Sequence, residues 1–204
     1  MAFLRSAQPE DYLDAVRGQT LVLRPPMLTD YAQWAELRNA SRAHLTPWEP
    51  AWSRDELVKS SYRRRLRSYA RDVRDDLSYA FFISDAAFDT LLGGITLSNV
   101  RRGAAQVATL GYWTGAPYAG SGKMQEAVET ILPFAFRVLQ LHRVEAASMP
   151  SNAASLRVLE KTGFTREGLA RHYLKINGVW EDHYLHARLA ASDDISGWRL
   201  GGAR

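Results

Sequence analysis

The stretch LGYWTGAPYAGSGKMQEAV, residues 110–128, contains the end of a predicted strand, a glycine-rich turn and the beginning of a predicted helix. The run from Gln106 to Trp113 is expected to be a β-strand, the third of a meander that follows the predicted strands at 78–84 and 91–98. Over 125–139 the apolar residues recur at the spacing of an amphipathic helix, with a bend expected near Pro133. A short buried strand is expected at 142–148. The segment therefore predicts a β-α-β unit whose two strands are parallel.

The segments on either side complete a mixed α/β domain with one central sheet. Asn152 caps a helix that Gly163 stops, and Asn177-Gly178 between two alternating runs is a strong hairpin signal. Gly111 lies inside a strand, where glycine marks a bulge or the close approach of a ligand. Further strands are predicted at 20–24, 78–84, 91–98, 168–176 and 179–189, helices at 30–38, 53–75 and 152–162, and a tryptophan-rich loop at 44–52.

Residues 20–190 are expected to form one domain, with an irregular leader over 1–19 and a flexible tail over 191–204. A chain of 204 residues with 46% hydrophobic content is long enough to bury a core. It has no cysteine, which excludes disulfides, zinc–thiolate sites and acyl-cysteine intermediates. The net charge of +4 permits an anionic cofactor or a ribosomal partner but does not require nucleic acid, so no DNA partner is expected.

The sequence shows no signal peptide and no apolar stretch long enough to cross a membrane. A cytoplasmic protein without a membrane partner is the expectation. The arginines between residues 63 and 74 are expected to line a solvated face of the predicted helix. His183 and His186 are three residues apart on a predicted strand and so face opposite sides, and no metal site is expected.

The turn at Gly120 and Gly122 suggests a phosphate site. Backbone N–H groups at such a turn, followed by the start of a helix, suit a pyrophosphate, and Lys123 can add charge. The alternative is a tight turn that needs glycine only for its positive φ. A nucleoside-triphosphate P-loop does not fit, because its first glycine falls on Pro117 and its hydroxyl position on Met124. The nucleophile-elbow and dinucleotide-binding patterns also fail.

Together with the second half of the chain, these segments resemble the GNAT acyl-CoA N-acyltransferases, and within them the RimJ/RimL type that acetylates the N-termini of ribosomal proteins. The stretches that carry the resemblance follow one another in the family's order: LTPWEP (45–50), LGYWTGAPYAGSGKMQEAV (110–128), LHRVEAASMPSNAASLRVLEKTGFTREG (141–168) and YLKINGVWEDHYLHARL (173–189). The resemblance covers residues 20–189 and implies the family's mixed sheet of about seven strands flanked by about four helices. The superfamily pattern has Gln or Arg at 119 and a small residue at 124, where this chain has Ala119 and Met124.

The resemblance implies direct attack of an amine on the thioester of acetyl-CoA. The pantetheine arm would lie along Leu110, Gly111, Tyr112 and Trp113, where one amide near Leu110 or Gly111 would stabilise the developing oxyanion. The diphosphate would be bound by Ala119, Gly120, Ser121, Gly122, Lys123, Met124 and Gln125. Ser155 would donate to the leaving sulfur and Asn152 would hydrogen-bond the cofactor. From the residues alone, the favoured interpretation of the pair is a helix cap and a neutral first-turn serine.

The sequence offers no carboxylate between residues 106 and 113 to act as the base. A protein α-amine titrates near about 7.7 to 8.0, against about 10.4 for lysine, so an N-terminal amine is already partly neutral. Glu49 is the candidate for gripping or deprotonating that amine, the alternative being a solvated acid in a loop. Trp48 and Tyr112 would wall the peptide slot, or belong to an aromatic core.

The expected function is acetylation of the N-terminal α-amine of a protein, a ribosomal protein that begins with Ala or Ser, by a monomer or homodimer. One alternative is the same chemistry on a small amine such as an antibiotic or a polyamine, for which a slot lined by acids is expected. The other is a non-catalytic module that binds acyl-CoA.

Overall fold

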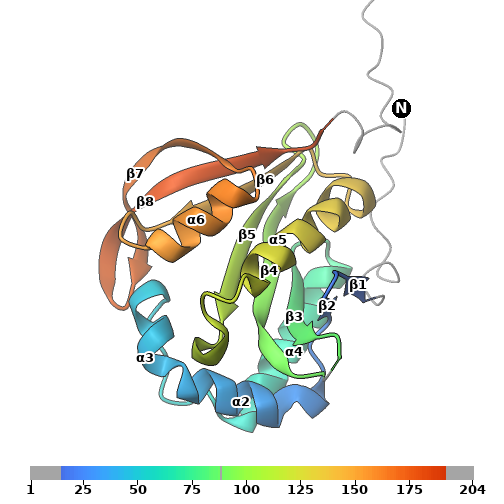
Figure 1. Ribbon diagram of the computed structural model, residues 1–204, viewed down its shortest axis with the longest axis vertical. Coiled ribbons are helices and arrows are strands. Elements are labelled where there is room, and N and C mark those ends of the chain that lie inside the picture. Colours follow the sequence, from blue (N-terminus) through green and yellow to red (C-terminus); the bar gives the residue numbers. More distant parts are fainter. Residues whose placement is uncertain (1–14, 88, 192–204) are drawn as a thin grey trace, which may run out of the picture.

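The computed structural model describes residues 15–87 and 89–191, and within them one sheet forms the centre of the molecule (Figure 1). Its eight strands lie in the order β1-β2-β3-β4-β5-β6-β8-β7. Neighbouring strands are antiparallel except β5 and β6, which are parallel, as the β-α-β prediction required. The strands are β1 Val16–Arg17, β2 Leu21–Arg24, β3 Tyr79–Asp85, β4 Leu91–Arg101, β5 Val107–Thr114, β6 Arg143–Ser148, β7 Thr165–Ile176 and β8 Val179–Leu189.

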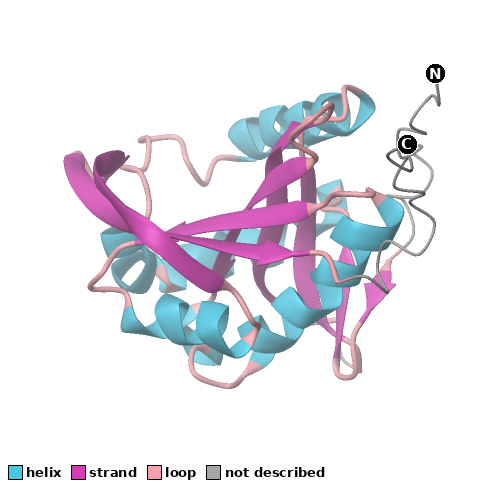
Figure 2. Ribbon diagram, turned by 90° about the horizontal axis from the view of Figure 1, so that it is seen from above, coloured by secondary structure: helices cyan, strands magenta, loops and turns pink. Residues whose placement is uncertain are grey.

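Helices cover both faces of this sheet, with α5 and α6 on one face and α2 and α4 on the other (Figures 1 and 2). The helices are α2 Tyr31–Ala40, α3 Arg42–Leu45, α4 Lys59–Arg74, α5 Lys123–Pro133 and α6 Ala153–Lys161, with short turns η1 Leu28–Asp30, η2 Thr46–Trp48, η3 Ala116–Tyr118 and η4 Phe134–Val138. The predicted α/β class is confirmed. The described residues contain one strand and one short helix more than the approximate numbers expected.

The central strand β3 shows why the sheet lies between two layers of helices. Phe81 and Ile83 belong to the larger core, together with Ile131 of α5. Phe82, between them, points to the other face and joins a second core with Trp34 of α2. A strand buried on both faces is a continuous apolar run, and this is the pattern that its sequence shows.

Two expected boundaries near the N-terminus are wrong. Residues 15–19 belong to the leader expected to be irregular, yet Val16 pairs with Leu23, so the short strand β1 extends the sheet. The expected loop at 44–52 is partly helical, because α3 ends at Leu45 and η2 follows it directly. The expected leader over 1–14 and the tail from 192 lie outside the described residues.

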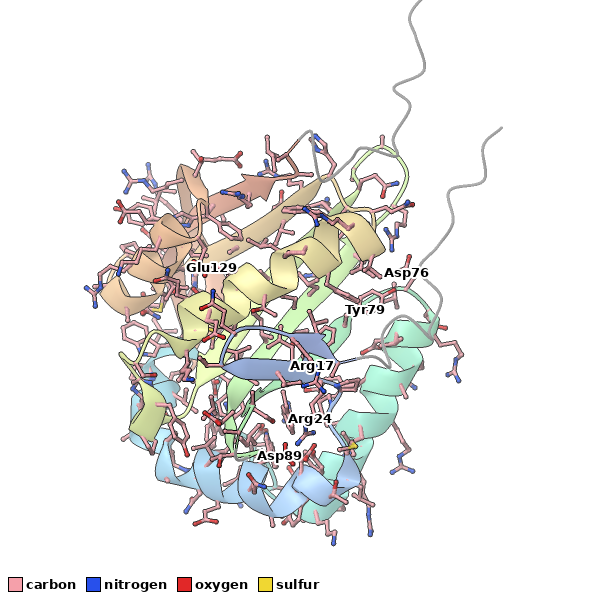
Figure 3. The ribbon with its side chains drawn as sticks, turned by 45° about the vertical axis from the view of Figure 1, so that its right-hand side comes forward. Arg17, Arg24, Asp76, Tyr79, Asp89 and Glu129 are labelled. Carbon is pink, nitrogen blue, oxygen red and sulfur yellow. The ribbon has the colours of Figure 1, made fainter. Side chains whose placement is uncertain are left out.

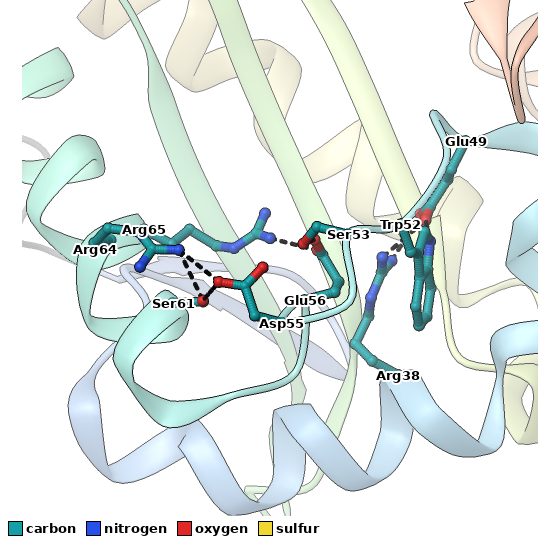
Figure 4. A network of polar contacts seen from close by, with 9 residues as sticks. All are labelled: Arg38, Glu49, Trp52, Ser53, Asp55, Glu56, Ser61, Arg64 and Arg65. Carbon is teal, nitrogen blue, oxygen red and sulfur yellow. Dashed lines mark hydrogen bonds and ion pairs between the residues drawn. The ribbon is translucent and has the colours of Figure 1, made fainter.

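Helix α4 begins at Lys59 and not at Ser53, where the predicted helix began because Ser53 and Glu56 have the spacing of a capping box (Figure 4). Ser53 and Glu56 do contact each other, with 3.5 Å between Oγ and Oε2, but the residues between them form a turn. The carboxylate of Glu56 instead accepts a hydrogen bond from Arg65 at 2.5 Å, two turns into the helix. Asp55 accepts hydrogen bonds from Ser61 and Arg64 in the same way. These contacts fasten the preceding turn to the side of α4. Most of the helix's arginines are exposed, as predicted.

Three other predicted features are confirmed. Asn177 and Gly178 both have positive φ, 44° and 90°, as a two-residue hairpin turn requires. Gly163, with φ of 76°, follows the end of α6. Pro133 has no N–H to donate, and beyond it the chain continues as a π-helical turn in which Leu139 N donates to Phe134 O at 2.9 Å.

A partly buried polar network fixes the chain that follows α4 against the end of η4 (Figure 3 labels Asp76 and Tyr79). Asp76 accepts hydrogen bonds from Arg102 at 2.6 and 2.8 Å and from the Tyr79 hydroxyl at 2.6 Å. Arg102 also donates to the backbone oxygen of Leu139. Burial alone would raise the pKa of Asp76. The hydrogen bonds from Arg102 and Tyr79 outweigh burial, so its pKa lies below the usual value.

Candidate active site

The parallel strands β5 and β6 separate halfway along β5. They pair only from Val107 to Thr109, whereas β5 continues to Thr114 (Figure 1). Beyond the last pair β6 stays with β8, which leaves one backbone edge of residues 110–114 open. Main-chain N–H and C=O groups at an open edge can bind an extended ligand as if it were another strand.

Gly111 lies on this open segment, and its expected bulge is wrong. It pairs in regular register with Thr96 of β4, and the register shift between these strands lies near Ser98 and Arg101. The second expectation for this glycine, space for a close approach, agrees with the structure. A Cβ built at Gly111 would meet no atom within 4 Å, so the space above it is open.

The glycine-rich turn leads from β5 into the N-terminus of α5. Gly120 and Gly122 have φ of 74° and 81°, and a Cβ added to either would meet nothing within 4 Å. Within the described part of the chain, none of the backbone N–H groups of residues 120–125 donates to a protein acceptor. No side chain caps the helix either. These unpaired N–H groups and the helix dipole make the turn a site for an anion.

The side chain of Lys123 does not take part in this site, contrary to the expected charge assistance. Its Nζ donates to the Thr20 hydroxyl at 2.6 Å and lies 3.8 Å from Asp85. Thr20 in turn donates to Glu126 at 2.5 Å. This network ties α5 to the edge of β2, so only the backbone of Lys123 faces the turn.

Two adjoining cavities lie along the separated strands. The inner cavity, of about 200 Å³, is lined by Trp48, Leu110, Gly111, Tyr112, Ala146, Ala147, Ser148, Met149, Asn152, Ser155, Leu159 and His183. The outer cleft, of about 290 Å³, is lined by His44, Leu45, Trp48, Glu49, Tyr112, Trp113, Thr114, Tyr118, Ala119, Gly120, Ser121, Gly122, Met124, Gln125, Asn152, Ala154, Ser155, Arg157, Val158 and Lys161. Every expected site residue except Lys123 therefore lines one or both. Trp48, Tyr112, Asn152 and Ser155 line both, which places them where the cavities meet.

A pair of hydroxyls lies at this junction. The Tyr112 hydroxyl is 2.9 Å from Ser155 Oγ, so one of them donates to the other. Burial raises the pKa of Tyr112 to about 12, which keeps its hydroxyl protonated at neutral pH. Asn152 Oδ1 accepts the backbone N–H of Ser155 at 3.0 Å and so caps α6. The cap fixes the first turn of α6 and holds Ser155 toward the cavities.

Both oxygens of the Glu49 carboxylate are engaged by protein groups (Figure 4). Arg38 donates to both of its oxygens, at 2.7 and 2.8 Å, and Trp52 Nε1 donates to one of them at 2.8 Å. The Arg38 side chain is 8% exposed and also lies over the Trp52 ring, 4.3 Å from its centroid. This geometry fits neither a free base nor a solvated loop acid. It closes the tryptophan-rich segment onto α2.

Three residues of the site were missed by the reasoning from sequence. Arg157 and Lys161, one turn apart on α6, line the outer cleft together with the glycine-rich turn, where cations suit phosphate groups. His183 of β8 lines the inner cavity. The spacing of Arg157 and Lys161 was a readable signal. Only the fold brings His183 to the cavity.

The described residues contain no group of three or more His, Cys, Asp or Glu side chains that could hold a metal ion. In residues 15–87 and 89–191, no helix is long and apolar enough to cross a membrane.

A sheet that opens between two parallel strands, beside a glycine-rich turn that begins a helix, defines an acyl-CoA-dependent acyltransferase. Residues 20–165 match the family described as Acetyltransferase (GNAT) domain, and the chain belongs to this family. It is 38% identical over 179 residues to the Probable N-acetyltransferase YjcK of Bacillus subtilis, covering 88% of this chain and 99% of that protein. It is 32% identical over 167 residues to the [Ribosomal protein uS5]-alanine N-acetyltransferase of Escherichia coli, covering 82% and 86%.

The fold has a solved counterpart in Mycobacterium smegmatis RimJ in complex with CoA-disulfide. The two structures superpose with a TM-score of 0.83 at 33% identity, over 88% of this chain and 89% of that one. The protein is thus an acetyltransferase whose acetyl donor is acetyl-CoA.

The residues that line the two cavities fit acetyl-CoA as the acetyl donor. The open edge of β5 suits the amide groups of the pantetheine arm, and the bare space over Gly111 leaves room for that arm. The unpaired N–H groups of the turn suit the diphosphate. Ser148 Oγ, buried in the wall of the inner cavity, has no hydrogen-bond partner in the described structure and can bind a polar atom of a ligand.

Proposed function

We propose that the protein acetylates the N-terminal α-amine of a protein, and that its substrate is a ribosomal protein beginning with Ala or Ser. The relationship to the uS5-alanine N-acetyltransferase of Escherichia coli supports this substrate class. The observation that carries the proposal is the charge of the inner cavity, which has no Asp or Glu in its wall. A polyamine or an aminoglycoside antibiotic carries several positive charges, whose desolvation in a neutral cavity would be unfavourable.

The outer cleft does not change this conclusion. Its one carboxylate is that of Glu49, which Arg38 and Trp52 already engage. A protein N-terminus brings a single amine, and a small first residue such as Ala or Ser suits a cavity of about 200 Å³. The peptide bonds that follow need hydrogen bonds but no countercharge.

The donor and the amine meet at the junction of the cavities. When bound, acetyl-CoA supplies the acetyl group as a thioester. The N–H groups of residues 120–125 would hold its diphosphate, and the open edge of β5 would align the pantetheine arm so that the acetyl group reaches the inner cavity. Trp48 and Tyr112, which line both cavities, would wall the passage for the peptide. Holding both reactants in place removes much of the entropic barrier to the reaction.

The hydroxyl pair gives the site its acid. Ser155 would donate its proton to the departing sulfur, and Tyr112, 2.9 Å away, would restore a proton to Ser155. Asn152 keeps Ser155 in position through the helix cap and has its side-chain N–H groups left for the donor. Since thiols titrate near about 8.5, the thiolate is already a good leaving group, and a hydrogen bond from a neutral hydroxyl is enough to assist its departure.

A substrate panel tests this proposal. The protein is incubated with acetyl-CoA and with peptides beginning Ala or Ser, peptides with a blocked N-terminus and an internal lysine, and spermidine. Acetylation of the free N-terminal peptides alone is expected. Equal labelling of the blocked peptides, or faster labelling of spermidine, would reject the assignment to protein N-termini.

A further inference from the structure

We infer that His183 is the general base of the reaction, the group that takes the proton from the attacking amine. The inference rests on the proposed function, because it concerns the same site. His183 lies on β8 and lines the inner cavity with Tyr112 and Ser155. It therefore reaches the cavity from the strand next to β6 in the sheet.

The tautomer of His183 follows from its hydrogen bond. Its Nδ1 lies 3.0 Å from the backbone oxygen of Glu181, and a carbonyl oxygen can only accept. Nδ1 must then carry a proton, and in the neutral form of the ring this leaves the lone pair on Nε2. In the described structure Nε2 of His183 forms no hydrogen bond with another protein group. The described side-chain atoms that are both fully buried and without a partner do not include it, so Nε2 is exposed to the cavity. It is therefore an accessible acceptor.

The ring is also held firmly in place. His183 is 3% exposed, and its ring packs edge-on against Tyr173, with 5.9 Å between the centroids. His183 pairs with Ala170 of β7, and the next residue, Tyr184, pairs with Ser148 at the end of β6. A base fixed in this way needs little reorganisation when the amine arrives, which favours proton transfer.

No other group lining the inner cavity can take this role. The cavity wall contains no carboxylate, and Glu49 of the outer cleft is engaged by Arg38 and Trp52. The hydroxyl of Tyr112 is protonated and shares a hydrogen bond with Ser155. The hydroxyl of Ser148 is a neutral alcohol and a poor base. Histidine is the side chain most often used as a general base near neutral pH.

The proton balance of the reaction then closes. The nitrogen lone pair of the amine forms the new N–C bond to the acetyl carbon as the C–S bond breaks. Nε2 of His183 takes the proton that the nitrogen must lose, and Ser155 gives its proton to the sulfur. Solvent removes the proton from His183 and returns one to Ser155, either directly or through the Tyr112 hydroxyl, which then takes a proton from solvent. Amine and thioester become amide and thiol with no other reactant.

The chain offers a matched control for the test. His186 lies three residues further along β8, is 7% exposed and lines neither cavity. His183→Gln keeps a donor for the Glu181 carbonyl but cannot accept a proton, and His186→Gln makes the same chemical change away from the site. With an Ala-starting peptide, His183→Gln is expected to lower kcat by about 100-fold or more. His186→Gln should stay within about threefold of wild type. Calorimetric titration should show both variants binding CoA as wild type does.

A second measurement does not depend on turnover. The ring signals of both histidines are followed by NMR in the wild-type protein saturated with CoA, which carries no acetyl group, as the Ala-starting peptide is added. The His183 signals are expected to shift and those of His186 to stay. This experiment decides the question if His183→Gln does not fold.

The outcomes separate the two proposals. If wild type acetylates no N-terminal peptide, the proposed function fails, and the same variants are compared on whichever amine it does acetylate. If wild type acetylates an amine and His183→Gln retains most of kcat, His183 is not the base. A His183 signal unchanged at saturating peptide would overturn the inference as well.

Discussion

The substitution Gly122→Ala tests the turn before α5, because it adds one methyl group at the centre of the anion site. Gly122 has φ of 81°, and an added Cβ would meet no protein atom within 4 Å. The substitution therefore creates no clash within the protein itself. The methyl would stand in open space beside the unpaired N–H groups of residues 120–125, where the diphosphate is proposed to lie.

The magnitudes follow from this geometry. An alanine held in the left-handed region is destabilised by about 1 kcal/mol relative to glycine. For a domain of this size that is a fall of about 2 to 4 °C in Tm. This strain is present in both the free and the bound protein, so it cancels in the binding free energy. A loss of affinity for CoA then measures contact between the methyl and the ligand, and we expect at least about tenfold, or about 1.4 kcal/mol.

The assay pairs thermal unfolding with calorimetric titration of CoA, and Gly178→Ala is the matched control. Gly178 also has a positive φ, 90°, and also has no atom within 4 Å of an added Cβ, but it lies in the β7–β8 turn and lines neither cavity. It should lower Tm by a similar amount and leave CoA affinity unchanged. If Gly122→Ala binds CoA as tightly as wild type, the diphosphate does not lie against this turn.

The remaining predictions concern the acid, the engaged carboxylate and the buried network. Ser155→Ala should lower kcat about 100-fold with CoA affinity within about threefold, and an unchanged kcat would remove Ser155 from the mechanism. Glu49→Ala leaves the Arg38 side chain, which is 8% exposed, without its partner. The substitution should lower the free energy of unfolding measured in urea by about 3 kcal/mol. A fall in kcat with unchanged stability would instead make Glu49 the base. Asp76→Asn should lower the free energy of unfolding by about 2 kcal/mol at pH 7, because the hydrogen bonds from Arg102 would lose their charged acceptor. The pKa of Asp76 is lower in the folded protein than in the unfolded chain, where it is about 4. The stabilisation that ionised Asp76 gives the fold is therefore complete above about pH 4 and is lost as the pH falls through the folded pKa. The difference in Tm between wild type and Asp76→Asn should therefore shrink in acid, and a difference constant down to low pH would contradict this reading.

Local patterns in the sequence were sufficient for most elements of the fold. Asn177-Gly178 allows a tight hairpin because both residues adopt positive φ, and Gly163 ends α6 for the same reason. The strand, turn and helix of residues 106–139 lie next to one another in sequence, so their order gave the β-α-β unit and its parallel strands. These features depend on short-range backbone preferences, which a single sequence contains.

The errors arose where a distant partner competes with a local pattern. Ser53 and Glu56 have the spacing of a capping box, but Glu56 pairs with Arg65 and the helix begins later. No partner for Glu49 was evident in the sequence because Arg38, which binds its carboxylate, lies on α2, eleven residues earlier in the chain. Only the packed structure decides which pairing is made.

The residues of the candidate site also differ in whether a local pattern or only the fold reveals them. The residues of the turn and Ser155 belong to contiguous motifs, and the resemblance to a family could assign them expected roles. His183 reaches the inner cavity because β5 and β6 separate after Thr109 and β8 pairs with β6, and no local pattern encodes that arrangement. The missing base was therefore the part of the site that the sequence was least able to supply.

A crystal structure of the protein with bound CoA tests the central claim most directly. The account predicts diphosphate oxygens within hydrogen-bond distance of backbone N–H groups in residues 120–125, with the pantetheine arm alongside residues 110–113. A diphosphate held by other elements, with those N–H groups left unpaired, would contradict it.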